Sequence, residues 1–186
     1  MKKFVKILAS VIVFLIIGLF IFRCCMVADR SFGKTPYPTD ALKTAFADGD
    51  AVVYTHDQTA EIASDGYFSA FNLFYCPEAE EAQFSVRWND SAYEYTDTEV
   101  GHEFTFVLVN ETTGDEYPCS VVESDSRALY NYRRLAVQGA VISSGDQVSA
   151  HMIVNDGYSS KQVIKYDGQA FKEYKLPAKL LAELAD

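Results

Sequence analysis

The stretch FTFVLVNETTGDEYPCSVV, residues 104–122, decides the fold of this chain. Two runs rich in β-branched and aromatic residues flank the polar loop NETTGDE, and the loop contains a glycine. Runs of this composition around a short turn-forming loop are typical of a β-hairpin. The stretch therefore predicts two antiparallel strands, over residues 103–110 and 116–122.

The same alternation of apolar and polar residues extends along most of the chain on both sides of the hairpin. Turn-forming groups such as Asp65-Gly66 and Asp167-Gly168 recur at spacings of roughly 8–12 residues, with no long helical pattern between them. This pattern predicts an all-β fold, a β-sandwich over residues 39–176. Further strands are expected over residues 51–56, 67–76, 83–88, 93–96, 130–142, 148–154 and 162–166.

Short helices are expected at the start and the end of this domain. Thr39 can cap a helix over residues 39–47, and Gly49 can end it. The tail LPAKLLAELAD, residues 176–186, places three leucines on one side and predicts a C-terminal helix over residues 177–186.

The order of aromatic residues in the expected strands resembles that of immunoglobulin-like sandwiches. Trp88 closes the strand QFSVRW, which occupies the place of the third strand in such folds. Tyr130 and Tyr132 stand at the start of the long seventh strand, near the place of a corner tyrosine. The resemblance implies an immunoglobulin-like β-sandwich. It covers the architecture alone, because Cys119 comes too early for the sixth-strand cysteine of a true immunoglobulin domain.

An apolar run, FVKILASVIVFLIIGLFIF at residues 4–22, precedes the domain and follows a short basic N-terminus at residues 1–3. A helix of this length spans roughly 28 Å, close to the thickness of the hydrocarbon core of a bilayer. The run is longer than the apolar region of a signal peptide, and a cut after Ala28 would place Met26 where a small residue is normally needed. We therefore expect an uncleaved transmembrane signal anchor with the lipid bilayer as its partner, followed by a juxtamembrane stalk over residues 23–38.

Basic residues indicate the orientation of this anchor. A very short basic N-terminus usually stays in the cytoplasm, so we expect a single-pass protein of the cell membrane with an extracytoplasmic C-terminal domain. Cys24 and Cys25 favour the opposite orientation if they are palmitoylated.

Residues 31–186 hold 11 basic and 25 acidic residues, a formal net charge of −14. Such a charge excludes nucleic acid as a partner of the domain.

Motifs of the common enzyme classes are absent from the sequence, including Gly-x-Ser-x-Gly, the P-loop and the dinucleotide-binding glycine motif. The histidines, His56, His102 and His151, lie on separate expected strands, whereas a zinc site needs three or four converging ligands. We expect no metal, no cofactor and no catalytic residue.

Cys76 and Cys119 are either a disulfide of an exported domain or two free thiols. Asn89 and Asn110 each begin a glycosylation sequon.

Paired aromatic side chains supply the candidate contact residues. Neighbouring tyrosines two positions apart project from the same face of a strand and can stack on sugar rings or anchor a protein partner, although half-buried tyrosines show the same pattern. Two arginines adjoin the second pair, and an outward-pointing arginine can contact a carboxylate or a phosphate group. The candidates are Tyr93, Tyr95, Tyr130, Tyr132, Arg133 and Arg134.

The sequence predicts a non-enzymatic, membrane-anchored interaction or accessory module of the cell envelope that binds an unknown protein or glycan. One alternative is a carbohydrate-binding domain that uses Tyr93, Tyr95 and Trp88. The other alternative is an enzyme with an unrecognised site, because function depends on sites and not on folds.

Overall fold

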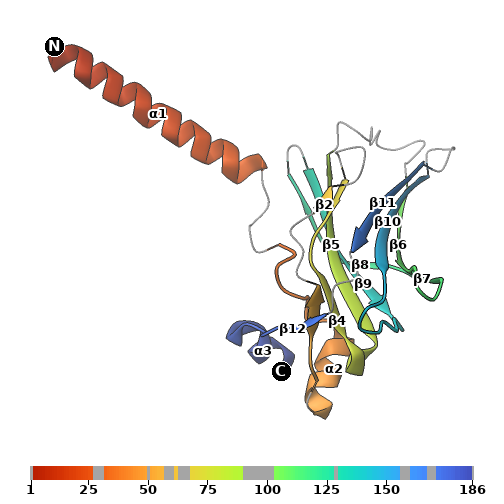
Figure 1. Ribbon diagram of the computed structural model, residues 1–186. Coiled ribbons are helices and arrows are strands. Elements are labelled where there is room, and N and C mark those ends of the chain that lie inside the picture. The colour runs from red at the N-terminus through yellow and green to blue at the C-terminus, as the bar shows by residue number, and fades with distance from the viewer. Residues whose placement is uncertain are drawn as a thin grey trace.

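The computed structural model describes residues 2–26, 32–49, 51–56, 61–62, 68–89, 103–127, 130–155, 160–166 and 171–185. Figure 1 shows a long N-terminal helix followed by two facing β-sheets, with two short helices at one end of the sheets. The helical elements are α1 (Lys2–Met26), α2 (Asp40–Asp48), α3 (Ala178–Ala185) and the 3-10 turn η1 (Pro77–Ala79).

Sheet A is antiparallel and has the order β12-β1-β4-β5-β3-β2, and β9 pairs with both β5 and β8. Its longest pair is β5 with β9, in which Glu81 faces Gln138 and Asn89 faces Tyr130. The strands are β1 (Tyr54–His56), β2 (Glu61–Ile62), β3 (Phe68–Ala70), β4 (Leu73–Cys76), β5 (Glu81–Asn89), β8 (Ser120–Ser126), β9 (Tyr130–Gln138) and β12 (Lys172–Glu173).

Sheet B is also antiparallel, with the order β11-β10-β6-β7. Its strands are β6 (Glu103–Asn110), β7 (Asp115–Pro118), β10 (Val148–Asn155) and β11 (Ser160–Tyr166). Alternate residues of the two sheets fill one hydrophobic core between them, as the period of two requires. On β5 these inward residues are Ala82, Phe84, Val86 and Trp88, each at most 2 % exposed. The expected two-sheet, mostly β architecture is therefore confirmed.

The hairpin predicted over residues 103–122 is present as β6 and β7, but the second strand is shorter than predicted. Val107 pairs with Pro118, and the Cys119 N–H donates to the Phe106 carbonyl at 3.0 Å. Proline has no N–H for a further ladder bond, and the chain then crosses to sheet A as β8. The single strand predicted over residues 116–122 is wrong for this reason.

Two other predicted strands also have different limits in the structure. Residues 67–76 contain β3 and β4, which both pair with β5 around one extra residue, so a β-bulge interrupts the strand. The strand predicted over residues 130–142 ends at Gln138, because Gly139 has a left-handed φ of +70°. The strand predicted over residues 93–96 lies outside the described residues.

Both predicted short helices are confirmed. Thr39 caps α2 by accepting a hydrogen bond from the Leu42 N–H at 3.3 Å. Leu42 and the α3 residues Leu180 and Leu184 are buried together in a second, smaller hydrophobic cluster with Phe74 and Cys76. This cluster lies on the side of sheet A that faces away from sheet B.

Residues 32–39, here called the strap, pack on the same outer face of sheet A. The rings of Phe32 and Tyr132 meet edge to face at 5.6 Å. The Gln83 side chain bonds both backbone groups of Tyr37, accepting from N–H at 2.6 Å and donating to C=O at 2.9 Å. This part of the expected stalk is therefore fixed to the sandwich.

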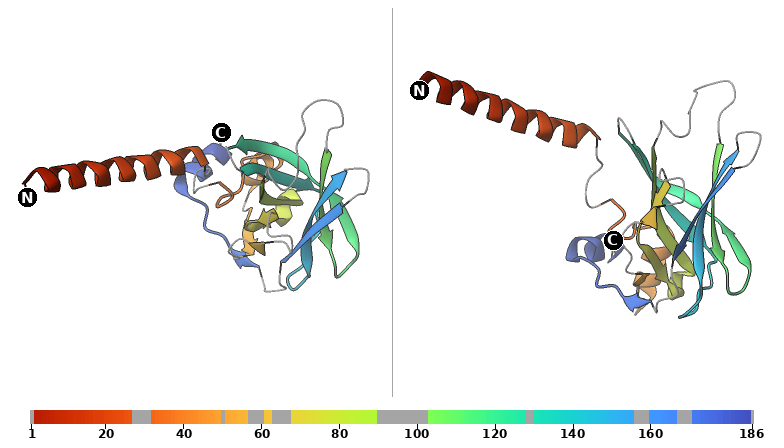
Figure 2. Two further views of the ribbon diagram at one scale, coloured as in Figure 1. Left: turned by 90° about the horizontal axis from the view of Figure 1, so that it is seen from above. Right: turned by 45° about the horizontal axis from the view of Figure 1, so that its top comes forward.

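Helix α1 stands clear of the sheets in the views of Figure 2. Residues Phe4–Phe22 have a mean hydropathy of 2.9, and no part of this segment is buried against the rest of the chain. Its large apolar side chains are 47–74 % exposed. By length and composition, the helix can cross a membrane.

Candidate functional site

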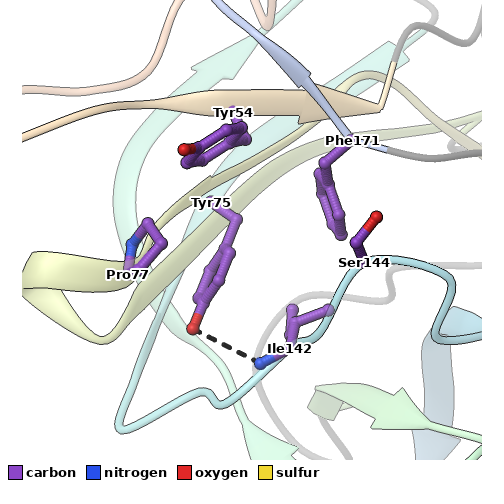
Figure 3. Close-up of a pocket in the computed structure, with 6 residues that line it drawn as sticks. All are labelled: Tyr54, Tyr75, Pro77, Ile142, Ser144 and Phe171. Atoms are coloured by element: carbon purple, nitrogen blue, oxygen red, sulfur yellow. Dashed lines mark hydrogen bonds between the residues drawn. The ribbon is translucent and has the colours of Figure 1, made fainter.

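An aromatic pocket of about 290 Å³ opens at the end of the sandwich next to η1. One wall comes from β1 and β4 of sheet A, and the opposite wall comes from the connection between β9 and β10. Figure 3 shows the six side chains that line the pocket. They are Tyr54, Tyr75, Pro77, Ile142, Ser144 and Phe171, and they are called the aromatic pocket from here on.

Tyr54 and Tyr75 face each other directly across the β1–β4 ladder, so their rings lie on the same face of sheet A. Tyr75 is only 7 % exposed, and its hydroxyl donates to the Ala140 carbonyl at 3.2 Å and accepts from the Ile142 N–H at 3.3 Å. Burial raises the pKa of Tyr75 above its usual value, which keeps the hydroxyl protonated and able to donate. Tyr75 on β4 therefore holds in place the connection between β9 and β10, which forms the opposite wall of the pocket.

Phe171 completes the aromatic lining. Its ring centroid lies 6.0 Å from that of Tyr75 with a tilt of 45°, and 5.6 Å from that of His56 at 90°. These contacts fix the ring on one side, and the side chain remains partly exposed on the other. Pro77 and Ser144 are exposed at the rim. The pocket thus combines aromatic surface with the Tyr54 and Ser144 hydroxyls, and none of its six residues is acidic or basic.

Outside the aromatic pocket, a group of polar side chains lies on the outer face of sheet B. It consists of Ser149, His151 and Glu111. Ser149 Oγ is 2.6 Å from Glu111 Oε1 and 2.8 Å from His151 Nε2, and this same nitrogen is 3.6 Å from Glu111 Oε1. In a catalytic triad the histidine contacts the serine through one ring nitrogen and the carboxylate through the other. Here Ser149 and Glu111 both lie at His151 Nε2, so the carboxylate does not hold this histidine as a general base for the serine. Ser149 is also fully buried. The hydrogen bond from Ser149 lowers the pKa of Glu111, and we assign the group a structural role.

The second predicted tyrosine pair, Tyr130 and Tyr132, lies at the start of β9, at the end of the sandwich away from the aromatic pocket. The Tyr130 and Tyr132 ring centroids are 6.4 Å apart, and Tyr132 is 3 % exposed beneath the strap. The Arg87 guanidinium lies 4.8 Å from the centre of the Tyr130 ring. Tyr93 and Tyr95 lie outside the described residues.

The two predicted arginines project to opposite faces of β9. The Arg133 guanidinium lies 5.3 Å from the Trp88 ring, whereas Arg134 contacts Phe32 in the strap at 5.2 Å. Arg134 is 9 % exposed and pairs with Glu123, Nε to Oε2, at 3.1 Å. Burial lowers the pKa of Arg134, and the Glu123 carboxylate opposes this shift. Trp88 is 2 % exposed, so it is a core residue and not a ligand contact.

Cys76 and Cys119 are both free thiols. Cys76 lies in the smaller cluster, and Cys119 packs against the main core. Burial raises the pKa of Cys76 to about 11 and that of Cys119 to about 12. The sequon residue Asn110 is fully buried, and its amide donates to Asp146 Oδ2 at 2.8 Å, so it is not presented for glycosylation.

No protein-family model, no curated protein and no solved structure matches this chain. Sequence reasoning missed Tyr54, Tyr75 and Phe171 as members of one site, because they come from three separate segments. The only signal was that Tyr54 and Tyr75 each stand in an expected strand. Their pairing depends on the register of β1 with β4, which a single sequence does not give.

Proposed function

We propose that this chain is a single-pass membrane protein whose β-sandwich is a non-enzymatic interaction module in the cell envelope, outside the cytoplasmic membrane. The observation that carries the proposal is the exposed apolar helix α1 joined to a sandwich that fills its own core. An anchor of this kind holds a water-soluble domain beside the bilayer.

The distribution of apolar residues around α1 supports a spanning helix. Apolar side chains such as Phe4, Val5, Phe20 and Ile21 point to all sides of the helix, and each is exposed. A helix that docks on a protein surface carries a single apolar stripe, whereas one that is apolar all round belongs in lipid or in a core. Within the described residues, no core surrounds it.

The two hydrophobic cores support an interaction role for the domain. The main core and the smaller cluster bury the apolar faces of both sheets and of α2 and α3. The domain is therefore packed internally, and its outer surface is available for contact with a partner. The serine–histidine–glutamate group has the wrong geometry for catalysis. The immunoglobulin-like relationship remains a prediction from sequence, supported by two facing antiparallel sheets with Trp88 buried between them.

Labelling of an introduced cysteine in intact cells, measured against the parent that retains Cys76 and Cys119, tests this proposal. We suggest replacing Cys24 and Cys25 by serine and introducing either Glu116→Cys, at an exposed site on β7, or Lys3→Cys. A membrane-impermeant maleimide is expected to label E116C in intact cells and K3C only after permeabilisation. The reverse pattern would place the domain in the cytoplasm and overturn the proposed location.

A further inference from the structure

We infer that the aromatic pocket binds an uncharged sugar ring, one residue of a neutral glycan. The inference rests on the proposed function, because an envelope glycan can reach only a domain outside the cytoplasmic membrane. Four features of the pocket carry it: the accessible rings, the rim hydroxyls, the absence of charge and the position in the sandwich.

The pocket presents accessible aromatic rings to a ligand. Tyr54 and Phe171 are partly exposed at the pocket, and Tyr75 lies buried between them and the connection that contains Ile142. Figure 3 shows Tyr54 and Phe171 flanking the same open space. The C–H face of a sugar ring is apolar and packs on an aromatic face as other apolar groups do. Since Tyr75 is held by two backbone hydrogen bonds, this surface is formed before any ligand arrives.

The hydroxyl groups make a purely apolar ligand a poorer fit. The Tyr75 hydroxyl is already satisfied by Ala140 and Ile142, so it places no demand on a ligand. Tyr54 and Ser144 add two hydroxyls to the lining, and each can donate and accept. A sugar offers hydroxyls to such groups around an apolar face. A hydrocarbon would leave them without a partner when it displaced water.

Charge and size narrow the ligand further. None of the six lining residues is acidic or basic, and residues 31–186 carry a net charge of −14. This field disfavours an anionic sugar, and the six described lining residues include no carboxylate to pair with a cation. The volume of about 290 Å³ lies just below the usual range for ligand pockets, roughly 300 to 1,000 Å³. The pocket therefore suits one ring of a chain that continues into solvent.

The strap shows where the pocket lies relative to the anchor. The chain enters the sandwich at Phe32, beside Tyr132, and Tyr132 pairs with Arg87. Tyr75 in the pocket pairs with Ala82, five residues away along β5. At about 3.3 Å per residue, this separation is roughly 17 Å. The pocket thus opens at the end of sheet A opposite the entry point of the chain, where a polymer outside the membrane can reach it.

Calorimetry on the full chain in lipid nanodiscs, without sugar-based detergents, tests this inference. The probes are the tetramer of N-acetylglucosamine, cellotetraose and choline chloride. We expect one of the two sugars to bind, and we expect Phe171→Ala and Tyr54→Ala each to weaken binding about tenfold or more. Tyr130→Ala, a tyrosine of similar burial at the other end of the sandwich, is the matched control and should leave binding unchanged.

A second variant keeps the test independent of folding losses. Ser144→Phe adds a ring at the exposed rim without removing any packing, and it should also abolish sugar binding. The inference is overturned if neither sugar binds, if choline binds instead, or if Tyr130→Ala weakens binding as much as Phe171→Ala. An E116C label from outside together with no sugar binding would reject this inference and leave the proposed function in place. Labelling of E116C only after permeabilisation would place the domain in the cytoplasm and reject both this inference and the proposed function.

Discussion

The hydroxyl of Thr39 lies 2.8 and 2.9 Å from the two carboxylate oxygens of Glu81. Glu81 is 1 % exposed, and its carboxylate also accepts hydrogen bonds from the side-chain amides of Gln83 and Gln138. Because Thr39 caps α2 as well, one side chain joins the strap, the first helix of the domain and the start of β5. A buried carboxylate with several donors stabilises a fold only while all of the donors remain.

The first prediction concerns this junction. Thr39→Val keeps the shape of the side chain but removes both the helix cap and the donor to Glu81. We expect a loss of about 2 kcal/mol in the free energy of unfolding. Thr39→Ser keeps the hydroxyl and should lose less than half as much. Urea unfolding of the full chain in nanodiscs, followed by tryptophan fluorescence, measures both. Equal stability of T39V and the parent would contradict the proposed role of Thr39.

The second prediction concerns the contact of the strap with sheet A. Gly33 has a φ of +77°, and a Cβ there would lie 2.9 Å from Ser85 Cβ. Gly114 has a similar φ of +81° with open space around it. Gly114→Ala should therefore cost only the backbone strain, about 1 kcal/mol, whereas Gly33→Ala should cost about 1–3 kcal/mol more from overpacking. Equal losses in urea unfolding would show that the strap does not pack closely.

The third prediction concerns pH. The Glu111 pKa is lowered chiefly by the Ser149 hydrogen bond, so this carboxylate stabilises the fold above its unfolded pKa of about 4.3. That contribution is lost as the pH falls through the lowered folded value. Ser149→Ala should cost about 1 kcal/mol at neutral pH, a small value because Glu111 is exposed, and progressively less in acid, where Glu111 becomes protonated. Urea unfolding at about pH 7 and pH 3 measures this, with Ser143→Ala as control. A loss that is the same at both pH values would count against it.

The fourth prediction concerns the two thiols of the domain. With raised pKa values of about 11 and 12, Cys76 and Cys119 should carry almost no thiolate at pH 8. In a variant with Cys24 and Cys25 replaced by serine, iodoacetamide should therefore modify neither thiol until urea unfolds the chain. Mass spectrometry of the alkylated protein gives the count. A tryptic peptide in which Cys76 is bridged to Cys119 would instead favour the disulfide alternative.

The sequence predicted the β architecture and both short helices because these features depend on local patterns. Alternation along Ala82–Trp88 marks a strand with one buried face, and Thr39 marks a helix start, with no knowledge of distant residues. The crossing of the chain at Cys119 was missed. The apolar pattern continues through Val121 and Val122, and only Pro118 signals that sheet B ends there.

The candidate site was harder to predict from sequence than the fold. The sequence drew attention to Tyr132 and Arg134, but the strap covers both through Phe32 and Tyr37. Pro36 and Pro38 indicated an extended stalk, and nothing local to them reveals that Tyr37 bonds to Gln83, 46 residues away. The aromatic pocket likewise needs the register of β1 with β4. Long-range pairing thus decided which tyrosines are accessible.

We propose that residues 4–22 remain in the lipid and hold the sandwich at the membrane. The most direct test is the intact mass of the protein recovered from cell membranes after an alkaline carbonate wash. We expect residues 1–186 as one uncleaved product of 20.8 kDa in the washed membrane fraction. A product that begins downstream of Ala28, or the complete chain in the soluble fraction, would contradict it.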